Sequence, residues 1–186
     1  KPLPTEKYAE QKLEAEKVLE RAGGNKYRTV RLGTFYGPSM RAELFNAAVL
    51  LAQLNTPQGE TPKIGINGDG TQSRRYVYVD DVVKAIMTVI EKGSDREIYN
   101  VCGDEDISVN QTIKVAENLA ARAFIQFQND NARIGEIQKQ NISNAKLKKL
   151  GWKPEVSYAE GMKKTWEWFK QQIDDAAFDK KYERHP

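Results

Sequence analysis

Apolar residues recur along this chain with two spacings, one typical of helices and one typical of short strands. The helical spacing predicts helices over 8–21, 43–54, from 80 or 81 to 91, 108–122 and 158–172, with a helical turn at 143–150. Runs of β-branched and aromatic residues predict strands at 27–32, 63–67, 76–79, 97–102 and 124–128, and residues 33–38 are expected to form a loop. Because helices alternate with strands, the expected fold class is α/β.

Capping residues mark several of the expected helix starts. Thr5, Ser108 and Ser143 each precede a helical segment and can accept hydrogen bonds from its first amides. Gly151 is expected to end the turn that Ser143 begins, because glycine readily adopts the left-handed conformation found after helices.

The helix that begins at Asp80 or Asp81 is strongly apolar. We expect the two acids to act as caps rather than as a general acid/base pair, because negative charge stabilises a helix N-terminus. The residues expected to face inward are Val82, Val83, Ile86, Val89 and Ile90.

Length and composition indicate an ordinary globular protein. The 186 residues suffice for one domain, or for one domain and part of another, and 39% of them are apolar. No apolar run reaches the roughly 18 residues of a membrane-spanning helix. A net charge of +3 with mixed signs does not favour nucleic-acid binding. We therefore expect a cytoplasmic protein that binds neither membrane nor nucleic acid.

Cys102 and His185 are the only cysteine and the only histidine. An internal disulfide, a thiolate-built metal cluster and catalysis or metal binding by histidine are therefore not expected. Cys102 is expected to be a buried small residue rather than a nucleophile, because no histidine is available to activate it.

A glycine turn between two expected strands carries two arginines. Gly68 and Gly70 permit the positive φ of a tight turn, and Arg74 or Arg75 follows as the chain becomes extended. The planar fork of an arginine side chain suits a phosphate, because it forms paired, charge-assisted hydrogen bonds. The alternative is a surface turn whose arginines are solvated.

Tyr8 and Lys12 stand four residues apart in the first expected helix, and so on one face of it. A nearby ammonium favours the phenolate and lowers the pKa of a tyrosine toward values useful for proton transfer. A solvated helix pair is the alternative, because a chain with eight tyrosines and many lysines can carry such a pair by accident.

Several motifs follow one another in a characteristic order. They are Tyr8-x-x-x-Lys12, Arg31-Leu-Gly-Thr-Phe-Tyr-Gly-Pro38, Gly68-Asp-Gly-Thr-Gln-Ser-Arg74, Tyr76-Val-Tyr-Val-Asp-Asp81, Ile98-Tyr-Asn-Val101 and Leu150-Gly-Trp-Lys-Pro154. This series resembles the C-terminal half of the extended short-chain dehydrogenase/reductase family, the NAD-dependent nucleotide-sugar epimerases and dehydratases. The resemblance covers nearly the whole chain.

The resemblance implies an architecture. The chain would hold the C-terminal part of a doubly wound, Rossmann-like parallel sheet and a smaller α/β substrate-binding domain. Residues 1–38 would be the remaining part of the dinucleotide-binding domain. Residues 39–172 would mainly form the substrate-binding domain, with Rossmann elements interleaved over 76–102, and residues 173–186 would be a tail.

The resemblance also implies roles for single residues. Tyr8 would be the acid/base that takes a proton from a sugar hydroxyl while hydride passes to NAD, and Lys12 would hold the nicotinamide ribose and tune the tyrosine. The loop residues expected near the cofactor and the substrate phosphates are Thr34, Tyr36, Gly37 and Pro38, with Thr34 also touching the sugar.

The nucleotide diphosphate would be bound by arginine. Arg74 holds the family's position for this contact, and Arg75 stands where an acid or another residue is more usual. Arg133, in a segment similar to a later Arg-Pro-Gly-Asp motif, is a second candidate, and two convergent arginines suit a dianionic ligand. Thr34 stands where many members have asparagine, in a minority pattern of the family.

The family's glycine-rich dinucleotide loop has no counterpart in this sequence. Gly65, Gly68 and Gly70 follow a short strand but open no helix, so they lack the required context. Binding of NAD, rather than NADP, is therefore expected to need a missing N-terminal half. We expect a truncated or processed chain that associates with that half or with itself.

Two functions follow from these expectations. The chain is either the C-terminal, substrate-binding half of an NAD-dependent nucleotide-sugar epimerase (an isomerase) or dehydratase (a lyase), or a non-catalytic module that binds nucleotide-diphosphate sugars without a cofactor domain. Epimerase and dehydratase are not distinguished, because the extra acid pair of the dehydratases would lie upstream.

Overall fold

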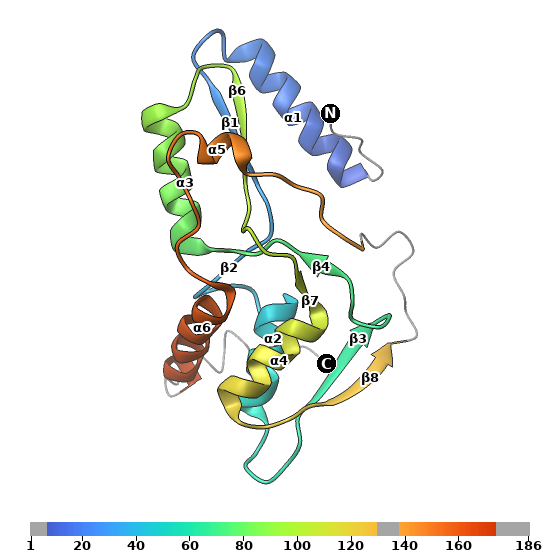
Figure 1. Cartoon of the computed structure of the whole chain (residues 1–186). Coiled ribbons are helices and arrows are strands. Elements are labelled where there is room, and N and C mark those ends of the chain that lie inside the picture. The colour runs from blue at the N-terminus through green and yellow to red at the C-terminus, as the bar shows by residue number, and fades with distance from the viewer. Residues whose placement is uncertain (1–6, 130–137, 174–186) are drawn as a thin grey trace.

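The computed structural model describes residues 7–129 and 138–173 (Figure 1). Its helices are α1 (Lys7–Ala22), α2 (Phe45–Asn55), α3 (Val79–Lys92), α4 (Val109–Ala120), α5 (Ala145–Lys148) and α6 (Tyr158–Ile173). Its strands are β1 (Arg28–Leu32), β2 (Phe35–Tyr36), β3 (Lys63–Asn67), β4 (Ser73–Arg74), β5 (Val77–Tyr78), β6 (Glu97–Val101), β7 (Ile107–Ser108) and β8 (Ile125–Asn129). Within this part of the chain, no helix is long and apolar enough to cross a membrane.

The strands pair two by two, and most of the pairs are parallel. β1 lies beside β6, β2 beside β5 and β3 beside β8, all parallel, whereas β4 and β7 are antiparallel. The register of the first pair runs from Arg28 opposite Glu97 to Leu32 opposite Val101. Parallel strands joined through helices confirm the expected α/β class.

One core lies between the β1–β6 pair and α3. Val82, Ala85 and Val89 of α3 are buried together with Tyr99 and Val101 of β6. The α5 segment closes the same cluster through Leu147 and Trp152. Figure 1 shows α3 and α5 beside these two strands.

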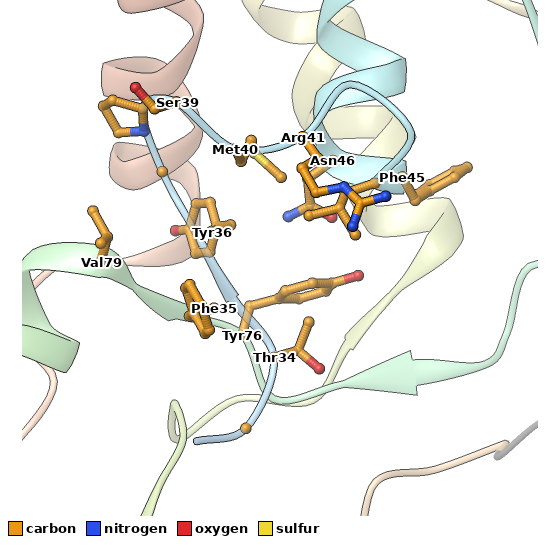
Figure 2. Close-up of a pocket in the computed structure, with 14 residues that line it drawn as sticks. Thr34, Phe35, Tyr36, Ser39, Met40, Arg41, Phe45, Asn46, Tyr76 and Val79 are labelled. Atoms are coloured by element: carbon orange, nitrogen blue, oxygen red, sulfur yellow. The ribbon is translucent and has the colours of Figure 1, made fainter. Parts of the chain in front are cut away.

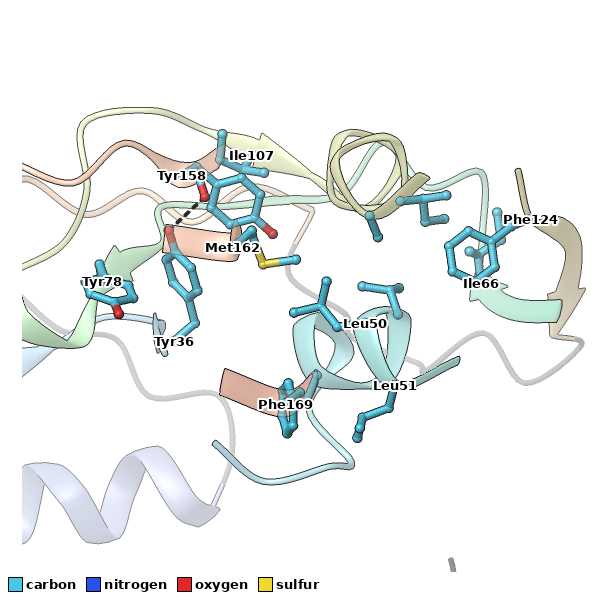
Figure 3. Packing of buried hydrophobic residues seen from close by; sticks show 14 residues of the cluster. Tyr36, Leu50, Leu51, Ile66, Tyr78, Ile107, Phe124, Tyr158, Met162 and Phe169 are labelled. Atoms are coloured by element: carbon cyan, nitrogen blue, oxygen red, sulfur yellow. Dashed lines mark hydrogen bonds between the residues drawn. The ribbon is translucent and has the colours of Figure 1, made fainter. Parts of the chain in front are cut away.

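A second and larger core lies among α2, α4 and α6 (Figure 3). Leu50, Ile113, Met162 and Phe169 are almost completely buried there. Burying one such side chain contributes about 1.5–3 kcal/mol, so this helix cluster is a principal source of stability. It supports the segment that leads from β2 into α2.

The expected inward face of α3 is partly wrong. Val83 is 56% exposed and Ile90 is 58% exposed, whereas Val82 and Val89 are buried. Successive helical residues are rotated by about 100°, so a helix that packs through Val82, Ala85 and Val89 turns Val83 and Ile90 to the side. Apolar residues occur around most of this helix, and the pattern alone therefore misplaced its buried face.

The expected cap role of Asp81 is also wrong. The N-cap residue of α3 is Tyr78, without a capping side chain, and Asp80 and Asp81 lie in the first turn. The buried carboxylate of Asp81 instead accepts hydrogen bonds from the backbone amides of Glu155 and Val156, each at 3.0 Å. The Asp81 side chain thus connects the turn before α6 to α3. This tertiary contact cannot be predicted from the local sequence.

The other expected caps have mixed outcomes. Ser108 forms a full capping box with Gln111, because each side chain binds the other residue's backbone amide. The N-cap position of α5 is Asn144, although the Ser143 hydroxyl does accept a hydrogen bond from the Ala145 amide at 3.3 Å. Thr5 lies outside the described residues.

Candidate functional site

A cavity of about 490 Å³ opens between the loop after β1 and the start of α2 (Figure 2). We call it the α2 cavity. It brings together four residues that the sequence singled out, Thr34, Tyr36, Gly37 and Pro38. Further lining residues that sequence reasoning did not select are Phe35, Ser39, Met40, Arg41, Leu44, Phe45, Asn46, Tyr76 and Val79, together with Gly33. The volume lies in the ordinary range of small-molecule sites.

The loop that forms this cavity is held by strand pairing and by a close approach. Residues 33–38 were expected to be a loop, but Phe35 and Tyr36 form β2, which pairs with β5. Gly37 has a φ of +153°, and a Cβ at this position would lie 2.6 Å from Val79. A glycine is therefore required where the loop passes over the first residue of α3.

Tyr36 lines the cavity with its ring but not with a free hydroxyl. Its side chain is buried, and the hydroxyl donates a hydrogen bond of 3.0 Å to the carbonyl of Tyr158 (Figure 3). Burial, with a smaller contribution from nearby Tyr78, raises the pKa of Tyr36 far above its usual value. In this geometry Tyr36 is a neutral, fixed part of the wall.

Tyr76 forms the aromatic floor of the cavity. Its ring lies 5.9 Å from that of Tyr36 and 5.3 Å from that of Tyr158, measured between centroids. Burial raises the pKa of Tyr76, and the positive charge of Arg74 opposes this shift. The sequence signal that identifies Tyr76 is its position two residues after Arg74, at the point where the chain enters β5.

The two adjacent arginines have different surroundings. Arg75 donates to the carboxylate of Asp106 and to the carbonyl of Ile142, both at 3.1 Å, and so connects two loops. Arg74 donates to the carbonyl of Ser73 at 2.9 Å, and its charge acts on Tyr76 in the cavity floor. Arg41, which sequence reasoning did not select, is the arginine that lines the α2 cavity, whereas Arg74 lies close enough to Tyr76 in its floor for its charge to act on that phenol. Arg133, the second diphosphate candidate, lies outside the described residues.

Tyr8 and Lys12 lie on α1, on one side of a cleft of about 820 Å³ between α1 and β1. We call it the α1 cleft. The Lys12 ammonium lies 5.4 Å from the centroid of the Tyr8 ring, and Tyr8 is 68% exposed. Gly33 and Phe35 line both this cleft and the α2 cavity. The two groups of predicted residues therefore occupy neighbouring hollows.

α1 makes few packing contacts with the rest of the described chain. None of its residues is buried, and its side chains Val18 and Leu19 are exposed. One connection between α1 and β1 is the ion pair of Glu16 with Arg31, whose guanidinium donates at 2.7 and 2.5 Å. The hydrogen bond to Glu16 raises the pKa of the Arg31 guanidinium.

Cys102 is buried, as expected, next to Gly103. Burial raises the pKa of its thiol. Across residues 7–129 and 138–173, no group of three or more histidine, cysteine, aspartate or glutamate side chains is placed to hold a metal ion.

Comparisons with known proteins show the family of this chain. The model of a family described as the NAD dependent epimerase/dehydratase family matches residues 1–102. The human dTDP-D-glucose 4,6-dehydratase is 32% identical to the chain over 90% of the chain and 49% of the human protein. The chain thus spans about half the length of this relative.

Solved structures show the same fold. A UDP-glucose 4-epimerase from Thermotoga maritima, solved with UDP-glucose, is 32% identical, with a TM-score of 0.79 over 92% of this chain and 56% of that one. A structure of MoeE5 with UDP-glucose and NAD is 27% identical, with a TM-score of 0.79 over 92% of this chain and 58% of that one. The expected Rossmann-like α/β class is thereby confirmed. The chain belongs to the NAD-dependent epimerase/dehydratase family.

Proposed function

We propose that this chain is the C-terminal, substrate-binding half of an NAD-dependent nucleotide-sugar epimerase or dehydratase. The observation that carries the proposal is the adjacency of the α1 cleft, with Tyr8 and Lys12, to the α2 cavity, with Thr34. A ligand that spans both hollows past Gly33 and Phe35 has an acid/base group at one end and a largely apolar pocket at the other.

The chemistry at the α1 cleft follows from two side chains. Tyr8, which lines the α1 cleft, takes the proton from a sugar hydroxyl. Lys12, one helical turn further on, holds its ammonium 5.4 Å from the centroid of the Tyr8 ring, beside the group that would exchange the proton. NAD, when bound, would accept the hydride that leaves the carbon bearing that hydroxyl.

The α2 cavity supplies binding. Arg74 contacts the diphosphate in this proposal, which its position after the glycine turn and its nearness to Tyr76 in the cavity floor support. Thr34 is half-buried in the wall, and its carbonyl accepts the Val77 amide at 3.0 Å, which fixes the loop that presents its hydroxyl. Arg133 is the second arginine of this proposal.

NAD binding in this proposal uses a further segment that packs on α1 and β1. Strand β1 pairs with β6 alone among the described strands, and parallel sheets are normally covered on both faces. Leu32 and Phe35 are exposed beside the α1 cleft, and α1 buries none of its residues. An N-terminal half, or a second copy of the chain, would cover these groups.

A binding module without turnover is the second candidate. The 68% exposure of Tyr8 favours it, because a catalytic tyrosine works best in a site closed to water. Both candidates bind nucleotide sugar, and they differ in whether a cofactor-bearing half restores chemistry.

Calorimetric titration of the folded chain with UDP-glucose, and separately with NAD, tests the binding claim. We expect UDP-glucose to bind, and Arg74→Ala to weaken it by about 1.5–3 kcal/mol, the usual cost of losing a charged hydrogen bond. Arg21→Ala is the matched control, since it removes the same charge from the exposed end of α1. Equal affinities for all three proteins would refute the role of Arg74.

A further inference from the structure

The amide nitrogen of Asn46 is buried without a hydrogen-bond partner. Asn46 lies in the first turn of α2, is 2% exposed and lines the α2 cavity. Within the described residues, only this nitrogen and Oδ1 of Asp81 are buried side-chain atoms of this kind. Because buried polar groups are nearly always paired, an exception in the wall of a cavity calls for an explanation.

The Tyr158 phenol lies near this amide. Burial raises the pKa of the Tyr158 phenol strongly, and the nearby Asn46 amide lowers it by a smaller amount, so the two groups are close. The Tyr158 hydroxyl, however, pairs with the Thr112 hydroxyl at 2.8 Å, and the Asn46 amide nitrogen meets the geometric criteria of a hydrogen bond with no group of the described residues. A carboxamide carries two N–H donors, so at least one stays available even if Tyr158 accepts the other.

The aromatic part of the cavity wall offers the Asn46 amide few hydrogen-bond acceptors. Tyr36, Phe45 and Tyr76 surround the cavity with aromatic rings, and the Tyr36 hydroxyl is already used on a carbonyl. Figure 2 shows the amide end of Asn46 on the cavity side of α2, facing the rings of Tyr36 and Tyr76. Asn46 is one of a few polar residues in this largely apolar wall, with Thr34 and Arg41, and such groups fix the orientation of a ligand.

We propose that Asn46 is a specificity-determining residue, whose carboxamide hydrogen-bonds a hydroxyl of the sugar in the bound nucleotide sugar. This inference rests on the proposed function and adds the group that reads the sugar. A hydroxyl both donates and accepts, so it pairs with either end of the carboxamide. A sugar that lacks this hydroxyl would leave the amide unpaired, which disfavours its binding.

The test compares Asn46→Leu with the unsubstituted chain. Leucine has a similar size but no polar group, so we expect a higher melting temperature without ligand and about 2- to 12-fold weaker binding of UDP-glucose. Binding of UDP, which has no sugar hydroxyls beyond its ribose, should be unchanged. Asn46→Ala repeats the binding comparison if the leucine variant does not fold.

Gln53→Leu is the matched control on the same helix. Gln53 is also 2% exposed, but its amide donates to the Arg122 carbonyl at 2.8 Å and accepts from the Arg122 guanidinium at 3.0 Å. We expect this variant to melt at a lower temperature and to bind UDP-glucose normally.

The outcomes separate the inference from the function on which it rests. Unchanged UDP-glucose affinity in Asn46→Leu, or an equal loss for UDP and UDP-glucose, would overturn the inference alone. A lower melting temperature with unchanged affinity would assign Asn46 a structural role. Failure of the unsubstituted, folded chain to bind UDP-glucose would overturn the proposed function together with this inference.

Discussion

Replacing Asp81 by alanine should destabilise the protein strongly. The buried Asp81 carboxylate accepts two backbone hydrogen bonds of 3.0 Å from Glu155 and Val156. Each hydrogen bond to a charged group contributes about 1.5–3 kcal/mol, which gives about 3–6 kcal/mol for the pair. The other carboxylate oxygen is buried without a partner, and its removal recovers about 1–3 kcal/mol. We therefore expect a net loss of about 2–3 kcal/mol.

Urea unfolding followed by tryptophan fluorescence measures this loss. The indole of Trp152 donates to the carbonyl of Asp81 at 3.0 Å, so a tryptophan reports on the same junction. Asp80→Ala is the control, because Asp80 is an exposed acid in the same helical turn and should cost at most about 1 kcal/mol. A loss below about 1 kcal/mol for Asp81→Ala, or equal losses for the two variants, would refute the anchoring role.

Three further predictions concern stability. Ser108→Ala should cost about 1 kcal/mol in urea unfolding by removing the capping box of α4, and no loss would contradict this. Gly37→Ala should lower the melting temperature, because a Cβ there lies 2.6 Å from a neighbouring side chain; an unchanged melting temperature would contradict the close packing. Burial raises the pKa of Asp104, but hydrogen bonds from Asn144 and Lys148 outweigh this and leave the pKa lowered. The resulting stability is present above the unfolded pKa of about 3.9 and is lost as the pH falls below it. Asp104→Asn should make the free energy of unfolding, measured with urea between about pH 5 and pH 3, decline less steeply as the pH falls. An identical decline in the variant and the unsubstituted chain would refute the assignment.

Local sequence was enough to predict most helices and strands but not which of their faces is buried. The α/β class and the helix that ends near Lys92 follow from residue spacing. The buried face of α3 did not, because Val83 and Ile90 are as apolar as Val82, and only packing on β1 and β6 selects among them. Strand β2 was missed because two residues are too few to show the alternation of apolar and polar side chains typical of a strand. Its pairing with β5 is a tertiary contact.

The candidate site was predictable where motifs mark it. Thr34 and Tyr36 come from the loop motif, and both line the α2 cavity. Asn46 was not predictable, because it sits inside an apolar helical run and becomes distinctive only when its amide is found buried and unpaired. The roles of Tyr8 and Arg74 remain predictions.

The central claim is that Tyr8 is the acid/base of an enzyme whose other half binds NAD. The most direct measurement joins this chain to the N-terminal half of the Thermotoga maritima relative and follows conversion of UDP-glucose with added NAD. We expect turnover that falls by about 10²–10⁴-fold in the Tyr8→Phe chimera, while UDP-glucose binding persists. A chimera that binds both ligands without turnover, or equal turnover in both forms, would contradict it.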